Sequence, residues 1–302
     1  MTNKLSIVEC DIVYLSYDEP NAERNYADLL TKAPWAKRVH GVKGSDQAHK
    51  ECAKVSDTER FITVDGDNIV NANFFNEVIE FDDSIPEDCV ISWASYNVIN
   101  GLIYGNGGLK CWTKSAVNNM RTHEHADNPR SEVDFCWDLK YKQVNKCFSE
   151  THNNATPYQA WRAGFREGVK MSLDRGVRFD TNDIAKSLHW RNLQRLLVWT
   201  SVGADAENGQ FAIYGARLGA AMTLCSDWDF RQVRDFDYLK NLYESTGCTA
   251  ENVEILSKQQ KDILLTHTTL NVVNLDPFTS RWAKTIYNNP SRTNLTVNTV
   301  ED

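Results

Sequence analysis

Two carboxylates that flank a single glycine follow directly on an apolar run in the first quarter of the chain. The run is Arg60-Phe61-Ile62-Thr63-Val64, and the motif is Asp65-Gly66-Asp67. Paired carboxylates supply hard oxygen ligands for a divalent cation beside a diphosphate, and the cation would neutralise the charge that develops as a group departs. Asp-x-Asp also occurs in plain surface turns, so its interpretation depends on the surrounding elements.

The chain before this motif alternates strand and helix patterns. The residue types and spacing predict strands at 11–17, 38–42 and 60–64, and helices at 22–30 and 46–55. Such alternation predicts a mainly parallel sheet, with ligands at the carboxyl ends of its strands. The Asp65-Gly66-Asp67 motif then lies at the ligand-binding edge, which favours a metal site over a surface turn.

With this arrangement the sequence resembles the GT-A glycosyltransferases over roughly residues 7 to 185. In that family an α/β half that binds a nucleotide sugar ends in such a motif, and an acceptor-binding half follows. The resemblance implies an α/β fold with a GT-A-like (Rossmann-like) mixed sheet flanked by helices. It also implies a UDP-sugar donor and a divalent metal, Mn²⁺ or Mg²⁺. Asp67 would bind the metal directly, and Asp65 would hold the donor's ribose or the metal's water shell.

Further donor-binding positions match the family pattern residue by residue. Tyr17, Asp18 and Glu19 follow the first strand, where the family holds the nucleobase and ribose; a turn that caps the next helix is the alternative. Gly107 and Gly108 resemble the glycine-containing segment that passes close to the donor sugar, although a hairpin turn explains them as well. Lys50, beside His49 on the second helix, could contact the uracil or the diphosphate, but one exposed basic pair is weak evidence.

Acceptor and metal positions follow later in the chain. Ser131-Glu132-Val133-Asp134, expected at the head of a helix through Trp137, resembles the family's acidic motif, in which Glu132 or preferably Asp134 would activate the acceptor hydroxyl. Helix N-capping is the alternative there. His152 follows the last expected strand of this part, where many of these enzymes place a histidine on the metal; a polar loop histidine is the alternative.

Other chemistry-bearing groups favour structural roles. The eight cysteines are scattered and never form Cys-x-x-Cys, so buried free thiols are favoured over disulfides or a zinc site. The polar loop that contains His123, Glu124, His125 and Asp127 is expected to be solvated rather than metal-bound. The aromatic residues Trp161, Phe165, Trp190 and Trp199 favour core packing over a base-stacking surface.

Charge is unevenly distributed along the chain. The formal net charge of −8 argues mildly against an overall attraction to nucleic acid, yet residues 140–195 hold eleven basic and five acidic residues. We expect a catalytic domain at 1–185, with a nucleotide-sugar half at about 1–110 and an acceptor half at about 111–185. A helical region at 186–288 and a polar tail at 289–302 complete the expected organisation. No apolar run predicts a membrane span or a signal peptide, so we expect a cytoplasmic protein.

A more specific resemblance is carried by residues 14–22 and 37–44, which look like glycosyltransferase-like proteins of large tailed phages. Some phage enzymes of this kind transfer glucose or arabinose from a UDP-sugar to 5-hydroxymethylcytosine in DNA. The resemblance therefore implies a DNA acceptor with a flipped base, in the host cytoplasm. Its contacts would be Lys140, Lys142, Lys146, Arg162 and Arg166; solvated, paired helix faces are the alternative. A glycan, protein or small-molecule acceptor, or a non-catalytic sugar-nucleotide-binding or virion module, remains open.

Overall fold

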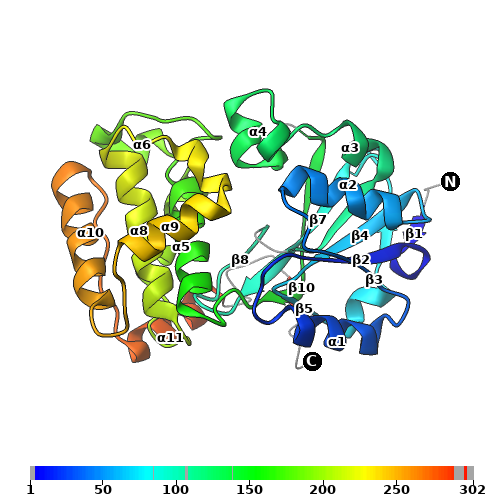
Figure 1. Ribbon diagram of the computed structural model, residues 1–302, viewed down its shortest axis with the longest axis horizontal. Helices are drawn as coiled ribbons and strands as arrows, with labels where there is room; N and C mark the ends of the chain where they lie inside the picture. Colours follow the sequence, from blue (N-terminus) through cyan, green and yellow to red (C-terminus); the bar gives the residue numbers. More distant parts are fainter. Residues whose placement is uncertain (1–3, 84, 106–107, 138, 289–295, 298–302) are drawn as a thin grey trace. The chain divides into compact units, whose positions relative to one another are not determined.

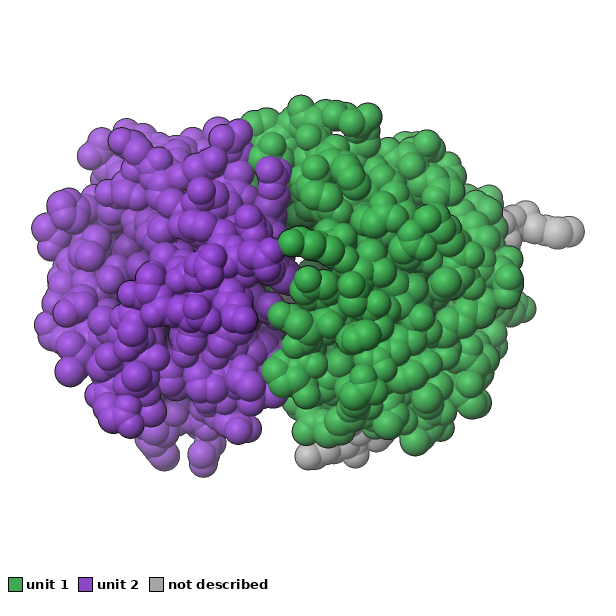
Figure 2. Space-filling view, viewed as in Figure 1, with its two compact units in different colours: residues 1–98, 103–152, 290–302 green, residues 99–102, 153–289 purple. Residues whose placement is uncertain are grey.

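The computed structural model describes residues 4–83, 85–105, 108–137, 139–288 and 296–297 of the 302-residue chain (Figure 1). The chain divides into two compact units, coloured separately in Figure 2. Unit 1 contains residues 1–98, 103–152 and 290–302, and unit 2 contains residues 99–102 and 153–289. The division after His152 differs from the boundary expected at 185, because Thr156 caps a long helix that belongs to unit 2.

Unit 1 is built on a mixed sheet. Among the described residues, the strand order is β11-β10-β7-β9-β4-β2-β3, with β5 added to β10 and β8 added to β7. The strands β3, β2 and β4 are parallel, as are β7, β10 and β11, whereas β9 runs antiparallel between β4 and β7. The bounds are β2 (Asp11–Ser16), β3 (Lys37–His40), β4 (Arg60–Asp65), β5 (Asn68–Val70), β7 (Val90–Asn97), β8 (Ile103–Tyr104), β9 (Lys110–Thr113), β10 (Tyr141–Thr151) and β11 (Thr296–Val297).

Helices cover both faces of this sheet (Figure 1). Helix α1 (Ala22–Lys32) packs on the face to which Ile12 and Tyr14 point, and α2 (Ser45–Val55) and α3 (Lys114–Asn119) pack on the face of Val13. This alternation along β2 follows from the two-residue period of a strand. Short elements complete the unit: β1 (Lys4–Ser6) with β6 (Val78–Glu80), α4 (Pro129–Val133), and the 3₁₀ turns Ile7–Glu9, Ala72–Asn76, His123–His125 and Phe135–Trp137.

The strands and helices expected up to residue 65 are confirmed within two residues at their ends. The mixed α/β class with flanking helices and a helical C-terminal region is confirmed as well. One local expectation is wrong, because no single helix runs from Ser131 through Trp137. Helix α4 starts earlier, at Pro129, since the Asn128 side chain accepts hydrogen bonds from the amides of Arg130 and Ser131.

Unit 2 is helical. Its helices are α5 (Pro157–Met171), α6 (Ile184–Ser187), α7 (Trp190–Trp199), α8 (Gly209–Cys225), α9 (Phe236–Ser245), α10 (Val253–His267) and α11 (Pro277–Tyr287), with 3₁₀ turns at Thr181–Asp183 and Phe230–Arg234. Glycines let α5 and α8 approach closely: a Cβ on Gly164 would overlap the carbonyl of Ala212, and one on Gly215 would overlap the carbonyl of Trp161. The backbone contact of these two helices thus forms the centre of the unit.

Two whole-chain expectations can be checked against this fold. All eight cysteines are free, and five of them are buried, which confirms that thiols rather than disulfides occupy these positions. In the part of the chain that the structure describes, no helix has the length and apolarity needed to cross a membrane.

Candidate functional site at the carboxyl edge of the sheet

The Asp65-Gly66-Asp67 motif forms the connection between two strands of unit 1. Asp65 ends β4, and Asn68 begins β5, which pairs antiparallel with the end of β10. The Gly66 carbonyl accepts hydrogen bonds from the Tyr14 hydroxyl at 2.7 Å and from the Asn25 amide at 3.1 Å. Strand β2 and helix α1 therefore hold the turn in place at the carboxyl edge, where the sequence predicts it.

His152 lies against this turn. The His152 amide donates a hydrogen bond to the Asp67 carbonyl at 2.7 Å, and the Asn21 side chain donates to the His152 carbonyl at 2.8 Å. The imidazole Nε2 is 3.0 Å from Oε2 of Glu150. The fold thus places His152 beside Asp67, although they are far apart in sequence. Coordination of a metal by these two residues stays a prediction.

Glu19 lies over the glycine of the motif. The Tyr17 amide donates a hydrogen bond to Glu19 Oε2 at 2.8 Å, and a Cβ on Gly66 would come within 2.6 Å of the same oxygen. Burial raises the pKa of Glu19, and the negative charges of Asp18 and Asp65 raise it further, against the hydrogen bonds that lower it. Like charges therefore gather at this edge, as expected where a cation is to bind.

Gly108 allows a second segment to approach the motif. A Cβ on Gly108 would overlap the Asp65 side chain and backbone, so only glycine permits this approach. The Gly108 amide also donates to Asn68 Oδ1 at 3.4 Å. Gly107, predicted together with Gly108, lies outside the described residues. The observed position of Gly108 agrees with a segment that passes close to a ligand held by Asp65.

The acidic motif occupies a different position in its helix from the one predicted. Glu132 lies in the first turn of the short helix α4, and Asp134 is the C-terminal cap residue of α4 and directly precedes the 3₁₀ turn Phe135–Trp137. The Asp134 carboxylate accepts a hydrogen bond from the Cys136 amide at 3.1 Å. Burial raises the pKa of the nearby Tyr141, and the charges of Asp134 and Asp65 both add to this increase. The charges of Asp134 and Asp65 therefore both act on Tyr141.

Lys50 and the loop that precedes α4 form a charge network around helix α2. Lys50 and His125 both pair with the fully buried carboxylate of Asp46, the latter at 3.3 Å. The Glu124 carboxylate accepts hydrogen bonds from the α2 amides of Asp46 at 3.2 Å and Gln47 at 2.9 Å. The loop is therefore bonded to α2, while Glu124, His125 and Asp127 are exposed to solvent as expected and His123 is buried. The role of Lys50 in donor binding stays a prediction.

Three groups lie on the same side of the sheet: His49, which the sequence placed in an exposed pair with Lys50 but which is buried, the buried Lys110 and the partly buried Tyr141. His49 donates through Nδ1 to the Ser45 carbonyl at 2.7 Å, and burial lowers its pKa, so its imidazole is neutral at pH 7. The charges of Asp65 and Lys110 act on this imidazole in opposite directions. Lys110 is buried within the apolar strand β9, and Tyr141 begins β10. The sequence signal that could have identified Lys110 is a lysine placed in an otherwise largely apolar strand.

The predicted nucleic-acid residues are divided between the two units. In unit 1, Lys140 pairs with Asp88 and Lys146 pairs with Glu77, and Lys142 is half-buried on β10. The corresponding residues of unit 2 pack on aromatic rings. The Arg162 guanidinium lies 4.6 Å from the centre of the Phe236 ring and that of Arg166 lies 5.1 Å from it.

Arg162 does not fit the predicted role as an exposed phosphate contact. The residue is only 9% exposed, because its stem lies within helix α5 and its guanidinium is covered by Phe236 and Tyr158. The alternative of solvated, paired helix faces does not describe these residues either, because Lys140 and Lys146 pair with Asp88 and Glu77 outside any helix and Arg162 is buried.

The donor set at the carboxyl edge fits a hard divalent cation that is shared with a ligand. Within the described ranges, no three His, Cys, Asp or Glu side chains gather as a metal site of their own. Mg²⁺ is typically held by one or two carboxylates together with substrate phosphates, and Asp65 and Asp67 supply such carboxylates.

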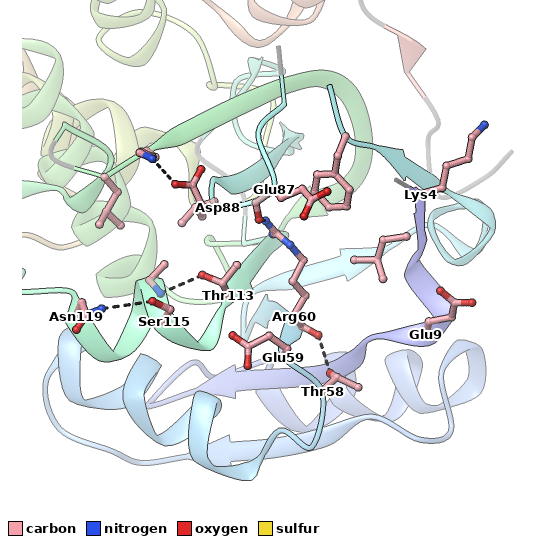
Figure 3. Close-up of a pocket in the computed structure, with 16 residues that line it drawn as sticks. Lys4, Glu9, Thr58, Glu59, Arg60, Glu87, Asp88, Thr113, Ser115 and Asn119 are labelled. Carbon is pink, nitrogen blue, oxygen red and sulfur yellow. Dashed lines mark hydrogen bonds and ion pairs between the residues drawn. The ribbon is translucent and has the colours of Figure 1, made fainter. Parts of the chain in front are cut away.

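A cavity of about 810 Å³ lies at the opposite edge of the sheet (Figure 3). It is lined by Arg60 at the start of β4, Val90 at the start of β7 and Lys140 just before β10. Arg60 reaches toward Glu87 in Figure 3 and donates to the Cys89 carbonyl at 3.0 Å. The charges in this cavity are thus bonded within the protein, and the cavity is separate from the carboxyl-edge site.

The comparisons with known proteins add no assignment. No protein-family model matches the sequence, and no curated protein is significantly similar to it.

Proposed function

We propose that the protein is a metal-dependent glycosyltransferase of the GT-A type that uses a UDP-sugar as donor. The observation that carries the proposal is the arrangement around the Asp65-Gly66-Asp67 turn. Glu19 from the end of β2, Gly108 and His152 all approach this turn at the carboxyl edge. Ligands of open α/β sheets bind at that edge.

In this proposal the residues of the turn hold the donor. Tyr17, Asp18 and Glu19 contact the nucleobase and ribose, and Asp65 and Asp67 hold the diphosphate end through Mn²⁺ or Mg²⁺. The cation supplies charge neutralisation for the departing UDP. Gly108 lets its own segment pass directly against Asp65, because a side chain at this position would overlap Asp65.

Asp134 is the proposed general base toward the acceptor hydroxyl in an inverting reaction. Support comes from Tyr141, whose pKa, already raised by burial, is raised further by both Asp134 and Asp65. A base within reach of the site can accept the hydroxyl proton as the sugar is transferred. The Cys136 amide donates a hydrogen bond to the Asp134 carboxylate and so holds it in place.

The proposed acceptor is 5-hydroxymethylcytosine in DNA, and the sugar transferred to it is glucose or arabinose. This part depends on the phage resemblance of residues 14–22 and 37–44. A second acceptor class, a glycan or small molecule, is favoured by the net charge of −8 and by the burial of Arg162. The chemistry at the carboxyl edge is the same in both cases.

The test is a screen of UDP-sugars with Mn²⁺ or Mg²⁺, in which UDP release is measured with hydroxymethylated DNA, unmodified DNA and free sugars as acceptors. We expect release that needs both the metal and an acceptor and that stops with EDTA. UDP-sugar binding without release for any acceptor would instead identify a non-catalytic binding module. Release with free sugars but not with hydroxymethylated DNA would retain the transferase and replace the acceptor.

A further inference from the structure

Helix α7 of unit 2 presents an aromatic side chain to solvent. Trp190, its first residue, is 62% exposed, whereas Leu196 and Trp199 on the same helix are buried in the core of the unit. The other aromatic residues of the series that the sequence assigned to the core, Trp161 and Phe165, are fully buried. The core assignment is therefore wrong for Trp190.

Cationic and hydrogen-bonding groups surround this ring. The Arg191 guanidinium lies 5.2 Å from the centre of the Trp190 ring, and the His189 imidazole stacks beside it with centroids 6.0 Å apart. His189 Nδ1 accepts a hydrogen bond from the Arg191 amide at 3.3 Å, so its proton is on Nε2, which can donate. Both neighbours are themselves exposed. A planar, partly cationic surface results.

The charge of the segment contrasts with that of the chain. Residues 184–204 contain Lys186, Arg191 and Arg195 and no aspartate or glutamate, although the chain as a whole has a net charge of −8. Lys186 pairs with Asp183 just before the segment, so the cation that lies against the ring is Arg191. Positive charge next to an exposed aromatic ring is the combination by which proteins hold single-stranded nucleic acid, since the ring stacks on a base and the cations meet the phosphates.

We propose that the His189-Trp190-Arg191 surface binds single-stranded nucleic acid, with one base stacked on Trp190 and the adjoining phosphates at Arg191 and His189. The proposal stands on the exposure of the ring and the charge of its segment. It bears on the DNA acceptor of the proposed function, for which this surface replaces the buried Arg162 as a contact. Binding itself requires no donor, so it can be measured separately from transfer.

The chain offers a matched control on helix α11. Trp282 is 59% exposed, close to the 62% of Trp190, and Arg281 precedes it in sequence as Arg191 follows Trp190. Near this second ring, Lys284 pairs with Asp205 at 2.9 Å, and Asp276 caps the start of the helix. Loss of an exposed tryptophan can therefore be compared in two electrostatic settings within one unit.

The experiment measures binding of the full chain to short fluorescein-labelled oligothymidylate and oligouridylate by fluorescence anisotropy, without UDP-sugar. Trp190→Ala should weaken binding by about 5- to 150-fold, the range for loss of one stacked base, while Trp190→Phe keeps most of the affinity. Trp282→Ala should bind as the unchanged protein does. Arg191→Glu should lower the slope of log K against log salt by about 0.7 for each lost phosphate contact. Preference for one oligonucleotide assigns the strand as DNA or RNA.

Any of three results with the oligonucleotides would overturn the proposal. The first is that the unchanged protein binds neither oligonucleotide at low salt, and the second is that Trp190→Ala and Trp282→Ala lose the same amount of affinity. The third such result is a Trp190→Ala protein whose affinity is unchanged. Binding to anionic phospholipid vesicles that also depends on Trp190 and exceeds binding to oligonucleotides would assign the surface to membranes, and would overturn it as well. Failure of UDP release with intact oligonucleotide binding would overturn the proposed function alone.

Discussion

The two ends of strand β2 carry carboxylates in opposite electrostatic surroundings. Asp11, at the start, accepts hydrogen bonds from Lys37 Nζ at 2.9 Å, from Ser56 Oγ at 3.2 Å and from the Asp57 amide. Burial would raise the pKa of Asp11, but these hydrogen bonds outweigh burial, and the pKa lies below its usual range. Glu19, just beyond the other end, has a raised pKa through burial and the charges of Asp18 and Asp65.

The difference shows which edge of the sheet is built for stability and which for a ligand. At the amino edge, charges are matched within the protein, as in the pairs of Asp11 with Lys37 and of Lys140 with Asp88. At the carboxyl edge, Glu19 and Asp65 repel each other. In the proposed function a cation would relieve this repulsion on binding. Mutations of carboxylates at the carboxyl edge should therefore reduce activity without reducing stability. Mutations at the amino edge should reduce stability without reducing activity.

The largest expected effect is on transfer at the carboxyl edge. Asp67→Ala should reduce UDP release on the order of 10³-fold or more, because a catalytic metal supplies several kcal/mol of charge stabilisation. Asp11→Asn, at the opposite end of β2, should keep the turnover of the unchanged protein. The measurement is steady-state UDP release, with circular dichroism to verify the fold of both variants. Near-normal turnover of Asp67→Ala in excess metal would remove this motif as the metal site.

The next effect concerns the acidic motif of Glu132 and Asp134. Asp134→Asn should lower kcat by about 10²- to 10⁴-fold, since a general base is lost, and should leave donor affinity unchanged. Glu132→Gln tests the second candidate base of the motif and should retain more activity than Asp134→Asn. The check is kcat from UDP release together with UDP-sugar affinity from calorimetry. If both variants retain the full kcat, the base lies elsewhere.

Local patterns in the sequence were sufficient for the strands and for the placement of the motif. The apolar run 60–64 predicts β4, and because this strand ends at Asp65 the turn that follows lies at the carboxyl edge. Side-chain environments made by distant segments could not be predicted. Arg162 is covered by Phe236, and the amide of Gln47 is bonded by Glu124, in each case across more than seventy residues. Sequence patterns predict whether a segment is a helix or a strand, but they do not predict which side chains from distant segments contact it.

The same limit explains the errors at the site. Ser131-Glu132-Val133-Asp134 has the composition of a helix start, yet Asn128 with Pro129 provides a stronger one, so the helix begins earlier. Lys110 was overlooked because its place beside His49 depends on β9 running antiparallel between β4 and β7. An antiparallel insertion into a parallel sheet cannot be recognised from an alternation of strand and helix patterns.

Stability should respond first at the amino edge. Asp11→Asn should lower the free energy of unfolding at neutral pH on the order of 1 to 3 kcal/mol, since hydrogen bonds to a charged group are lost. The folded-state pKa of Asp11 is lowered, so its contribution is present above the unfolded pKa of about 3.9 and is lost as the pH falls through the folded pKa. Urea unfolding at several pH values should show a gap between the two proteins that closes in acid. If the difference in free energy of unfolding stays constant with pH, the packing of the Asp11 side chain, and not its charge, stabilises the protein.

The smallest effect, and the sharpest contrast, is expected for Glu19→Gln in metal-free protein. Because the pKa of Glu19 is raised in the folded state, its ionised form lowers stability above that pKa, and the penalty vanishes below the unfolded value of about 4.3. Glutamine keeps an oxygen for the Tyr17 amide and removes the charge, so it should stabilise the protein at pH 7 by about 0.5 to 2 kcal/mol.

Divalent metal should reverse the order of stability of Glu19→Gln and the unchanged protein. Mn²⁺ binds the folded state of the unchanged protein and relieves the repulsion between Glu19 and Asp65, so the unchanged protein should gain more in Tm from Mn²⁺ than Glu19→Gln does. Thermal unfolding at pH 7 and pH 4, with EDTA or with Mn²⁺, measures both effects in one series. Asp11→Asn, whose partner is Lys37 of the protein itself, should show no difference from the unchanged protein in its response to metal. A Glu19→Gln protein that is less stable than the unchanged one in EDTA at pH 7 would place Glu19 with Asp11 among the structural carboxylates, and the contrast between the two edges would be lost.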